Sequence, residues 1–205
     1  MVTGRVMFLI DGFNIYHSLR EQPHLWKYKW LNLYRLCQIL IPKRCQITKV
    51  YYCSAYATWD ANKMARHQQY VRLLKTTPVE VVLGRFKEKS VKCRLCHREF
   101  KTSIEKETDI NIAIKLVQGG IHDMYDSAII VSGDSDLVPA IRGIKETFPT
   151  KQIGVAFPIS RASKDLKQVA DFSMKLHEYQ LSTCQFPDRV DVGGGLILER
   201  PTAWR

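Results

Sequence analysis

Residues 128–136 read AIIVSGDSD, an apolar run that ends in a turn carrying two aspartates. Short, β-branched runs bounded by a turn are typical of strands, and a run that is apolar throughout indicates a strand covered on both faces. A second run of this kind, residues 6–10, leads directly into Asp11. In a parallel sheet with helical crossovers, ligands bind beyond the carboxyl ends of the strands. The two runs therefore predict an α/β sheet with acids gathered at one edge.

The same patterns recur along the chain and predict alternating strands and helices. Residues 109–117 are the clearest helix, because Ile110, Ala113, Ile114 and Val117 have the spacing of one helix face. Strands are predicted at residues 6–10, 49–56, 79–86, 128–132 and 153–157. Helices are predicted at residues 31–40, 61–75, 109–117, 137–147 and 164–169. We therefore expect an α/β fold with a parallel sheet and right-handed crossovers.

Size and charge limit the class of protein. The chain has 205 residues, of which 45% are hydrophobic, and this is enough for one continuous core. The formal net charge of +11 favours an anionic partner such as nucleic acid or an anionic membrane surface. No apolar stretch approaches the roughly 18 residues of a membrane helix, and the first apolar run is too short for a secretory signal. We expect a soluble cytoplasmic protein with no membrane partner.

Two segments depart from the alternation. Residues 84–106 hold eight Lys or Arg against three Glu and look like a basic insertion. Residues 181–205 include three consecutive glycines at 193–195, which predicts a turn-rich tail that wraps the surface or stays mobile. The predicted organisation is one domain over residues 1–180, with the insertion at about 84–106, followed by the tail 181–205.

Four aspartates and one asparagine form the main candidate site. Carboxylates that crowd together resist ionisation unless a cation lies between them, and hard divalent cations prefer oxygen ligands. The asparagine, three residues beyond the first aspartate, is suited to orient a carboxylate or a metal-bound water. The candidate site residues are Asp11, Asn14, Asp109, Asp134 and Asp136.

Each acid also has a plain structural interpretation. Asp134 and Asp136 suit the start of the helix that begins near Leu137, because short polar side chains cap helix N-termini. Asp109 complements the dipole at the start of its own helix. Residues 132–136 also predict a turn, in which Gly133 can accept a strained backbone conformation. Helix capping does not require acids at all three places, that is, after two different strands and at the start of a separate helix. The joint pattern therefore favours a metal site.

Three sequence blocks carry a resemblance to a known family. They are FLIDGFN at residues 8–14, KETDINIA at 106–113 and VSGDSDL at 131–137, and the likeness continues through IGVAF at 153–157 and ADF at 170–172. Together they resemble the signature blocks of NYN domains, which belong to the PIN-like nuclease superfamily, and the chain looks closest to the LabA-like branch. The resemblance covers roughly residues 5–175.

The resemblance implies a PIN-like fold, that is, a three-layer α/β/α sandwich around a central, mostly parallel sheet of five or more strands, with a metal-dependent ribonuclease site. By position, Asp11, Asp109, Asp134 and Asp136 form the acidic metal-binding set, and Asn14 is the adjoining polar residue. Mg²⁺ or Mn²⁺ held there would activate water for hydrolysis of RNA phosphodiester bonds. The alternative is a noncatalytic RNA-binding or regulatory adaptor with the same fold, because a fold does not by itself establish turnover.

Basic residues are expected to bind single-stranded RNA, because phosphate contacts give sequence-independent affinity. Trp59 and Tyr56 follow the second predicted strand. They either pack beneath the adjoining helix, the more common role of aromatic side chains, or stack on an unpaired base. The residues predicted to bind RNA are Lys87, Lys89, Lys92, Arg94 and Arg98 in the basic insertion, and Arg161 and Lys164 after the fifth strand.

A Cys-X-X-Cys-His cluster, formed by Cys93, Cys96 and His97, lies within the basic insertion. Two thiolates at this spacing suit one edge of a tetrahedral Zn²⁺ site, whose other ligands would come from elsewhere or from another chain. The alternative is a pair of reduced thiols whose ionised form is stabilised by nearby Lys and Arg. The pattern also matches haem attachment, but no export signal or axial ligand arrangement supports that interpretation.

Overall fold

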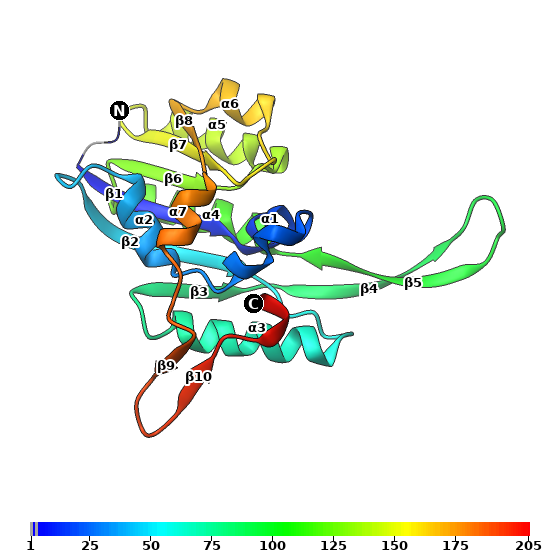
Figure 1. The fold of residues 1–205 in the computed structure, drawn as a ribbon. Helices are drawn as coiled ribbons and strands as arrows, with labels where there is room; N and C mark the ends of the chain where they lie inside the picture. The colour runs from blue at the N-terminus through cyan, green and yellow to red at the C-terminus, as the bar shows by residue number, and fades with distance from the viewer. Residues whose placement is uncertain (1, 3) are drawn as a thin grey trace.

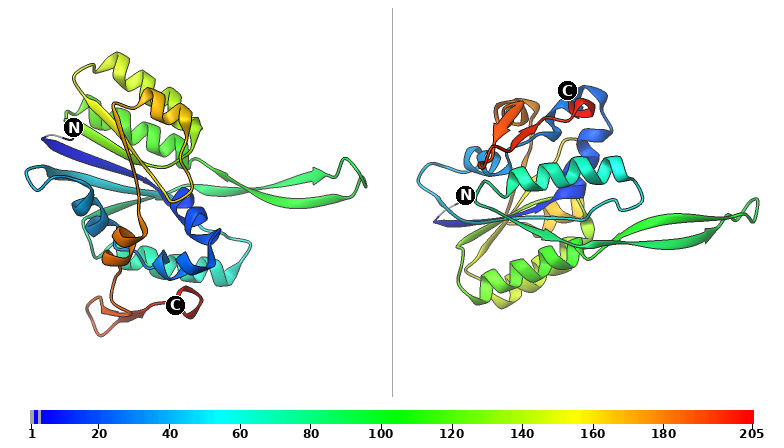
Figure 2. Two further views of the ribbon diagram at one scale, coloured as in Figure 1. Left: turned by 45° about the horizontal axis from the view of Figure 1, so that its top comes forward. Right: turned by 90° about the horizontal axis from the view of Figure 1, so that it is seen from below.

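The computed structural model describes residue 2 and residues 4–205, and its centre is a sheet of six parallel strands in the order β3-β2-β1-β6-β7-β8 (Figure 1). Helices cover both faces of this sheet (Figure 2), so the predicted α/β sandwich with a central parallel sheet is confirmed. The strands are β1 (Arg5–Asp11), β2 (Gln46–Ser54), β3 (Val79–Leu83), β6 (Ser127–Val131), β7 (Gln152–Phe157) and β8 (Phe172–Lys175).

The core has two layers because side chains alternate along each strand. Val6, Phe8 and Ile10 of β1 face one layer, whereas Met7 and Leu9 face the other. The first layer is covered by α1 (Gly12–Arg20), α2 (Leu33–Leu40), α3 (Ala61–Leu74) and α7 (Glu178–Thr183). The second layer is covered by α4 (Thr108–Ile121), α5 (Val138–Thr147) and α6 (Lys164–Val169).

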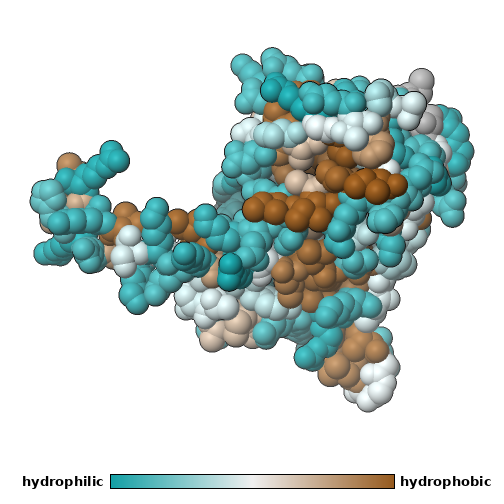
Figure 3. All heavy atoms as spheres, turned by 180° about the vertical axis from the view of Figure 1, so that it is seen from behind, coloured by the Kyte–Doolittle hydropathy of each residue, from teal (hydrophilic) through white to brown (hydrophobic). Residues whose placement is uncertain are grey.

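The predicted helix at residues 109–117 exists, but the apolar face that identified it is mostly exposed. Ile112 and Leu116 of α4 are fully buried, whereas Ile110 is 61% exposed. Ile114 and Val117 are also exposed. The spacing rule identifies a helix but not which of its two apolar faces meets the sheet. Apolar side chains consequently gather on the surface seen in Figure 3.

Two features of the sheet differ from the prediction. The strand predicted at residues 79–86 ends at Leu83, because the chain leaves the sheet at Gly84. A Cβ atom at Gly84 would lie 2.6 Å from the carbonyl oxygen of Lys106, so glycine allows the two chain segments to approach. The sixth strand, β8, was not predicted and completes one edge of the sheet.

The basic insertion is an antiparallel hairpin of β4 (Arg85–Lys92) and β5 (Glu99–Lys106), which extends away from the body (Figures 1 and 2). Its pairing runs without interruption from Arg85 opposite Lys106 to Lys92 opposite Glu99. Only the base of the hairpin lies close to the sheet. Most of its cations are therefore carried outside the body.

The C-terminal segment packs back onto the first core layer. It contains β9 (Arg189–Asp191), β10 (Ile197–Glu199) and a 3₁₀ helix, η3 (Thr202–Trp204). The ring of Trp204 lies 6.1 Å from that of Trp30 and 6.0 Å from that of Tyr70. Within the described part of the chain, no helix combines the length and the apolar character that a bilayer crossing requires.

Candidate metal and nucleic-acid site

Asp11 lies where β1 ends and α1 begins, and it is only 4% exposed. Its Oδ1 accepts a hydrogen bond from the backbone N–H of Asn14 at 2.9 Å, which caps α1. Its Oδ2 accepts from the hydroxyl of Ser132 at 2.8 Å. Ser132 directly follows β6, the neighbour of β1 in the sheet. The adjacency of these two strands therefore joins two distant segments at one carboxylate.

Asn14 connects α1 to the turn after β6. Its Oδ1 accepts from the backbone N–H of Gly133 at 2.9 Å. The next N–H, that of Asp134, donates to the Ser132 hydroxyl at 3.0 Å. Gly133 does not adopt the strained conformation that glycine can accept, since its φ is not positive. Glycine is needed there for a different reason: a Cβ atom would lie 1.8 Å from the carbonyl oxygen of Arg161.

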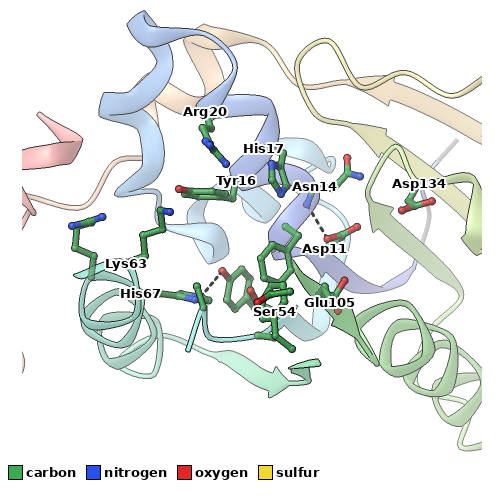
Figure 4. A pocket seen from close by; sticks show the side chains of 18 of the residues that line it. Asp11, Asn14, Tyr16, His17, Arg20, Ser54, Lys63, His67, Glu105 and Asp134 are labelled. Carbon is green, nitrogen blue, oxygen red and sulfur yellow. Dashed lines mark hydrogen bonds between the residues drawn. The ribbon is translucent and has the colours of Figure 1, made fainter. Parts of the chain in front are cut away.

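Three of the four predicted aspartates line one pocket. Asp11, Asp109 and Asp134 do so, together with Glu105 at the end of β5, which the sequence did not single out (Figure 4 shows all but Asp109 labelled). Asp136 is exposed and lies outside the lining. The structure thus brings together most of the predicted acidic set and adds one acid from the base of the hairpin.

The plain structural interpretations hold in part, since the N-cap of α5 is Leu137 and no side chain caps that helix. Asp134 Oδ1 accepts from the backbone N–H of Asp136 at 3.0 Å and caps the short 3₁₀ helix η2 (Ser135–Leu137). Glu105 accepts from the backbone N–H of Thr108 at 3.1 Å, at the start of α4. Asp109 lies in the first turn of α4. Capping and a role in the pocket are therefore compatible, because the helix starts themselves lie at the carboxyl edge of the sheet.

Two carboxyl groups have raised pKa values. Burial raises the pKa of Asp11 to about 6, and the negative charges of Glu105 and Asp134 add to the effect. Burial also raises the pKa of Asp109 to about 7, assisted by the charges of Asp11, Asp134, Glu105 and Asp136. The charged neighbours that act on both groups are acids. A cation between them would reverse this effect.

The carboxylates of the pocket suit a hard divalent cation, although they are too far apart to bind one as they stand. An oxygen-only group of partly buried carboxylates with unbalanced negative charge has the chemistry that Mg²⁺ or Mn²⁺ prefers. Among residues 2 and 4–205, however, no three His, Cys, Asp or Glu side chains are already close enough to hold an ion. To hold an ion, the carboxyl groups of Asp11, Asp109 and Asp134 would have to move closer together.

The pocket extends beyond the acids into an aromatic and cationic region. Its volume is about 480 Å³. The ring of Trp59 lies edge-on to Phe86, 4.4 Å away, and Phe86 is edge-on to Phe13 at 5.1 Å. Trp59 is 52% exposed, so it does not pack beneath the adjoining helix as the more common role suggested. Tyr56 does contact that helix, with its ring 5.1 Å from His67 of α3.

The residues predicted to bind RNA fall into two groups. Arg161 lines the pocket and forms an ion pair with Glu21. Lys164 is exposed at the first turn of α6. The other five lie along the hairpin or at its tip, are exposed, and do not line the pocket: Lys87, Lys89, Lys92, Arg94 and Arg98.

Cys93 and Cys96 lie at the tip of the hairpin as free thiols. The backbone N–H of Cys93 donates to the carbonyl of Arg98 at 2.8 Å, and that of His97 donates to the carbonyl of Cys93 at 2.9 Å. The N–H groups of Cys96 and Leu95 lower the pKa of the Cys93 thiol. The turn therefore favours a thiolate, and the described chain supplies two thiols there without a third metal ligand.

The cationic wall of the pocket was missed by the sequence analysis. It consists of Arg20 at the end of α1 and of Lys63 and Arg66 on α3. One signal was present in the sequence, since Lys63, Arg66 and His67 have the i, i+3, i+4 spacing of one helix face. That spacing alone does not show what the face meets.

Comparisons with known proteins agree with this architecture. A family model for the NYN domain matches residues 5–177. The chain is similar to 6-hydroxy-3-succinoylpyridine 3-monooxygenase HspA of Pseudomonas putida, with 25% identity over an alignment 241 positions long that covers 98% of this chain and 75% of that protein. It is also similar to the crystal structure of a protein of unknown function from Vibrio parahaemolyticus, with a TM-score of 0.60 and 19% identity over 85% of this chain and 93% of that one. At this identity the structural likeness supports the fold alone.

Proposed function

Because this chain belongs to the NYN domain family, we propose that it is a metal-dependent ribonuclease that hydrolyses phosphodiester bonds of cytoplasmic RNA. The three sequence blocks support its placement in the LabA-like branch of the family. The observation that carries the proposal is the convergence of Asp11, Asp109 and Asp134 on one pocket, where two carboxyl pKa values are raised.

These three aspartates would hold Mg²⁺ or Mn²⁺, with Asp136 adding negative charge nearby. A divalent ion bound there supplies a Lewis acid for the scissile phosphate and an activated water for attack on phosphorus. The protein itself positions the ligands. Ser132 and the backbone of Asn14 fix the two oxygens of Asp11, and the side chain of Asn14 holds the turn at Gly133.

The substrate partner in this proposal is single-stranded RNA. The exposed cations of the hairpin and Arg161 at the pocket supply phosphate contacts, whose contribution to affinity falls as salt rises. The lone Cys93–Cys96 pair supplies half of a zinc site, and we assign it no part in the cleavage chemistry.

The test is cleavage of labelled single-stranded RNA with Mn²⁺ or Mg²⁺ by the wild type and by Asp134→Asn. Asparagine keeps the acceptor for the Asp136 N–H but removes the charge, so we expect cleavage to fall about 100-fold or more while RNA affinity changes little. Glu146→Gln, an exposed acid on α5, is the matched control and should cleave as the wild type does.

The alternative function is a noncatalytic RNA-binding adaptor. The observation that favours it is that, among the described residues, the acids are not close enough together to hold an ion. Salt-sensitive RNA binding with no cleavage under either metal would support the adaptor and overturn the nuclease. Equal cleavage by the wild type and Asp134→Asn would instead show that the acids are misassigned.

The Pseudomonas putida relative suggests a third function, oxygenation of a small hydroxylated pyridine. The aromatic lining of the pocket is the observation that favours it. The check is incubation of the protein with 6-hydroxy-3-succinoylpyridine, oxygen and an added two-electron reductant. We expect no consumption of the pyridine, and steady consumption would make this the leading function.

A further inference from the structure

One end of the pocket, away from the acids, is lined by cations. Arg20 is the last residue of α1, and Lys63 and Arg66 lie on α3. All three line the same cavity as the carboxylates. Figure 4 shows Arg20 and Lys63 on the side of the cavity opposite Asp134. The pocket therefore has an acidic end and a basic end.

The positive charge at the basic end is only partly balanced by acids. Lys63 forms an ion pair with Asp60 at 2.9 Å. No ion pair joins Arg20 or Arg66 to an acid among the residues that the structure describes. Lys29 does not line this pocket, but burial lowers its pKa to about 8, and the positive charges of Arg20 and Arg66 lower it further. Cations held together in this way form a favourable site for an anion.

Aromatic rings also line the pocket. Tyr16 and Tyr52 line the cavity, and the Tyr52 hydroxyl hydrogen-bonds to Nε2 of His67 at 3.1 Å. Trp59 and Phe86 form a partly exposed edge-on pair from two different segments, the loop before α3 and the base of the hairpin. Rings of this kind bind unpaired bases through their faces without regard to sequence.

We propose that the basic end of the pocket is a nucleotide subsite, in which the aromatic rings contact one unpaired base while Arg20, Lys63 and Arg66 bind its phosphate. The inference rests on the proposed function in one respect, because the acids would then act on a neighbouring phosphate of the same strand. The cavity of about 480 Å³ has the size of a site for one nucleotide-sized ligand.

The subsite defines the substrate class more narrowly. A base that is paired in a duplex keeps its faces stacked and cannot enter between protein rings. The substrate is therefore a single strand that presents at least two consecutive phosphates, one for each end of the pocket. The cations also offset the repulsion that the carboxylates exert on an anionic strand.

The test is the binding of adenosine 5′-monophosphate, measured by calorimetry in EDTA. The double variant Arg20→Gln/Arg66→Gln removes two of the three cations, and we expect its affinity to fall about tenfold or more, as for the loss of charge-assisted hydrogen bonds. Arg44→Gln/Arg142→Gln removes the same charge from exposed positions elsewhere and should bind as the wild type does. Equal affinity of all three proteins would overturn the phosphate assignment.

A single substitution tests the base contact separately. Trp59→Ala should weaken binding of adenosine 5′-monophosphate and leave binding of inorganic phosphate unchanged. Because Trp59 is half exposed, this variant is expected to fold normally, which its thermal melting curve checks. If adenosine 5′-monophosphate binds the wild type no more tightly than inorganic phosphate does, the base contact is wrong.

Nicotinate serves as the probe for a small aromatic carboxylate. Weaker binding of nicotinate than of the nucleotide supports the nucleotide subsite, and tighter binding would overturn it in favour of a small aromatic acid. These binding measurements need neither metal nor cleavage. If the variants weaken nucleotide binding but the protein does not cleave RNA, the subsite is supported and the nuclease proposal is rejected. If the protein cleaves RNA but binds no nucleotide, the nuclease proposal is supported and the subsite is rejected.

Discussion

Asp11 both stabilises the fold through hydrogen bonds and contributes a carboxyl group to the pocket. One of its carboxyl oxygens caps α1, and the other accepts from Ser132 across the junction of β1 and β6. These hydrogen bonds favour its ionised form, but burial and neighbouring acids outweigh them and raise its pKa. The fold therefore holds an acid whose charge is unfavourable until a cation arrives.

The pH dependence of stability follows from Asp109. Its pKa is raised to about 7 in the folded chain from an ordinary value of 3.8, so the folded state binds the proton more tightly. Metal-free protein consequently loses stability as the pH rises from about 4 to about 7, and regains it on acidification. At pH 8, Asp109→Asn should raise the free energy of unfolding by about 1–2 kcal/mol, after allowance for solvent screening.

Urea unfolding in EDTA at pH 8, 6 and 4 measures this effect. The gain from Asp109→Asn should shrink as the pH approaches 4, and Mn²⁺ at pH 8 should stabilise the wild type more than the variant. Asp165→Asn, an exposed acid on α6, provides the control. A variant that is less stable than the wild type at pH 8 without metal would contradict the burial argument.

At this scale the sequence predicted those site residues whose positions follow from local structure. Asp11 and Asp134 come just after apolar strands, so a parallel sheet places them at one edge. Glu105 was missed because its position depends on the pairing of β5 with β4, which no local pattern specifies. Arg20 and Arg66 were missed because their proximity depends on how two helices pack over the same layer.

The β4–β5 hairpin has two parts with different proposed roles, a base that lines the pocket and an outer part that binds RNA. Its base contributes Phe86 and Glu105 to the pocket, whereas its outer part carries exposed cations. A strand with alternating lysines does not pair with other strands readily, which protects a projecting hairpin from aggregation. The outer part is thus free to make electrostatic contacts without supporting the core.

Shortening the hairpin tests this division. Replacing residues 90–101 with Asn-Gly joins the paired Lys89 and Thr102 by a two-residue turn. The change removes four cations, so the slope of log affinity for single-stranded RNA against log salt should fall by up to about 3. The melting temperature should change by no more than about 3 °C, because no core residue is removed.

Fluorescence anisotropy over a salt series gives the slope. The variant Cys93→Ser/Cys96→Ser keeps the length and the cations, and it should bind as the wild type does. An unchanged slope in the shortened protein would assign RNA binding to another surface.

The sequence predicted elements according to how strongly their apolar residues repeat. The strands β1 and β6 each contain an unbroken apolar run and were located to within one residue at each end. The short strand β8 was missed because its four residues alternate between half-buried and exposed positions. Strands β4 and β5 were recognised only as a basic insertion, because a hairpin outside the core needs no apolar run.

At the scale of the whole molecule, the C-terminal segment closes the first core layer. Trp204 is 7% exposed, packs against Trp30 and Tyr70, and lines the pocket. Composition alone predicted a turn-rich tail that wraps the surface or stays mobile, since the glycines dominate its local pattern. Trp30 and Tyr70, whose rings contact Trp204, lie 174 and 134 residues before it in the sequence, so short-range patterns did not reveal these contacts.

Trp204→Ala should lower the free energy of unfolding by about 3–5 kcal/mol, because it leaves a cavity in a ring cluster. The corresponding fall in melting temperature is on the order of 10 °C. Differential scanning calorimetry checks this result, and Arg205→Ala is the control because Arg205 is exposed. A fall of less than about 2 °C would mean that the segment contributes little to stability.

The position of β1 has a consequence for synthesis of the chain. Val6 pairs with Ile47 on one side of β1 and with Ser127 on the other. A nascent polypeptide can form the first pairing early, whereas the second must wait until more than half the chain has left the ribosome. During that interval an apolar strand edge is open to other polypeptides. The yield of correctly folded protein should therefore depend on translation speed and on chaperones that bind the nascent chain.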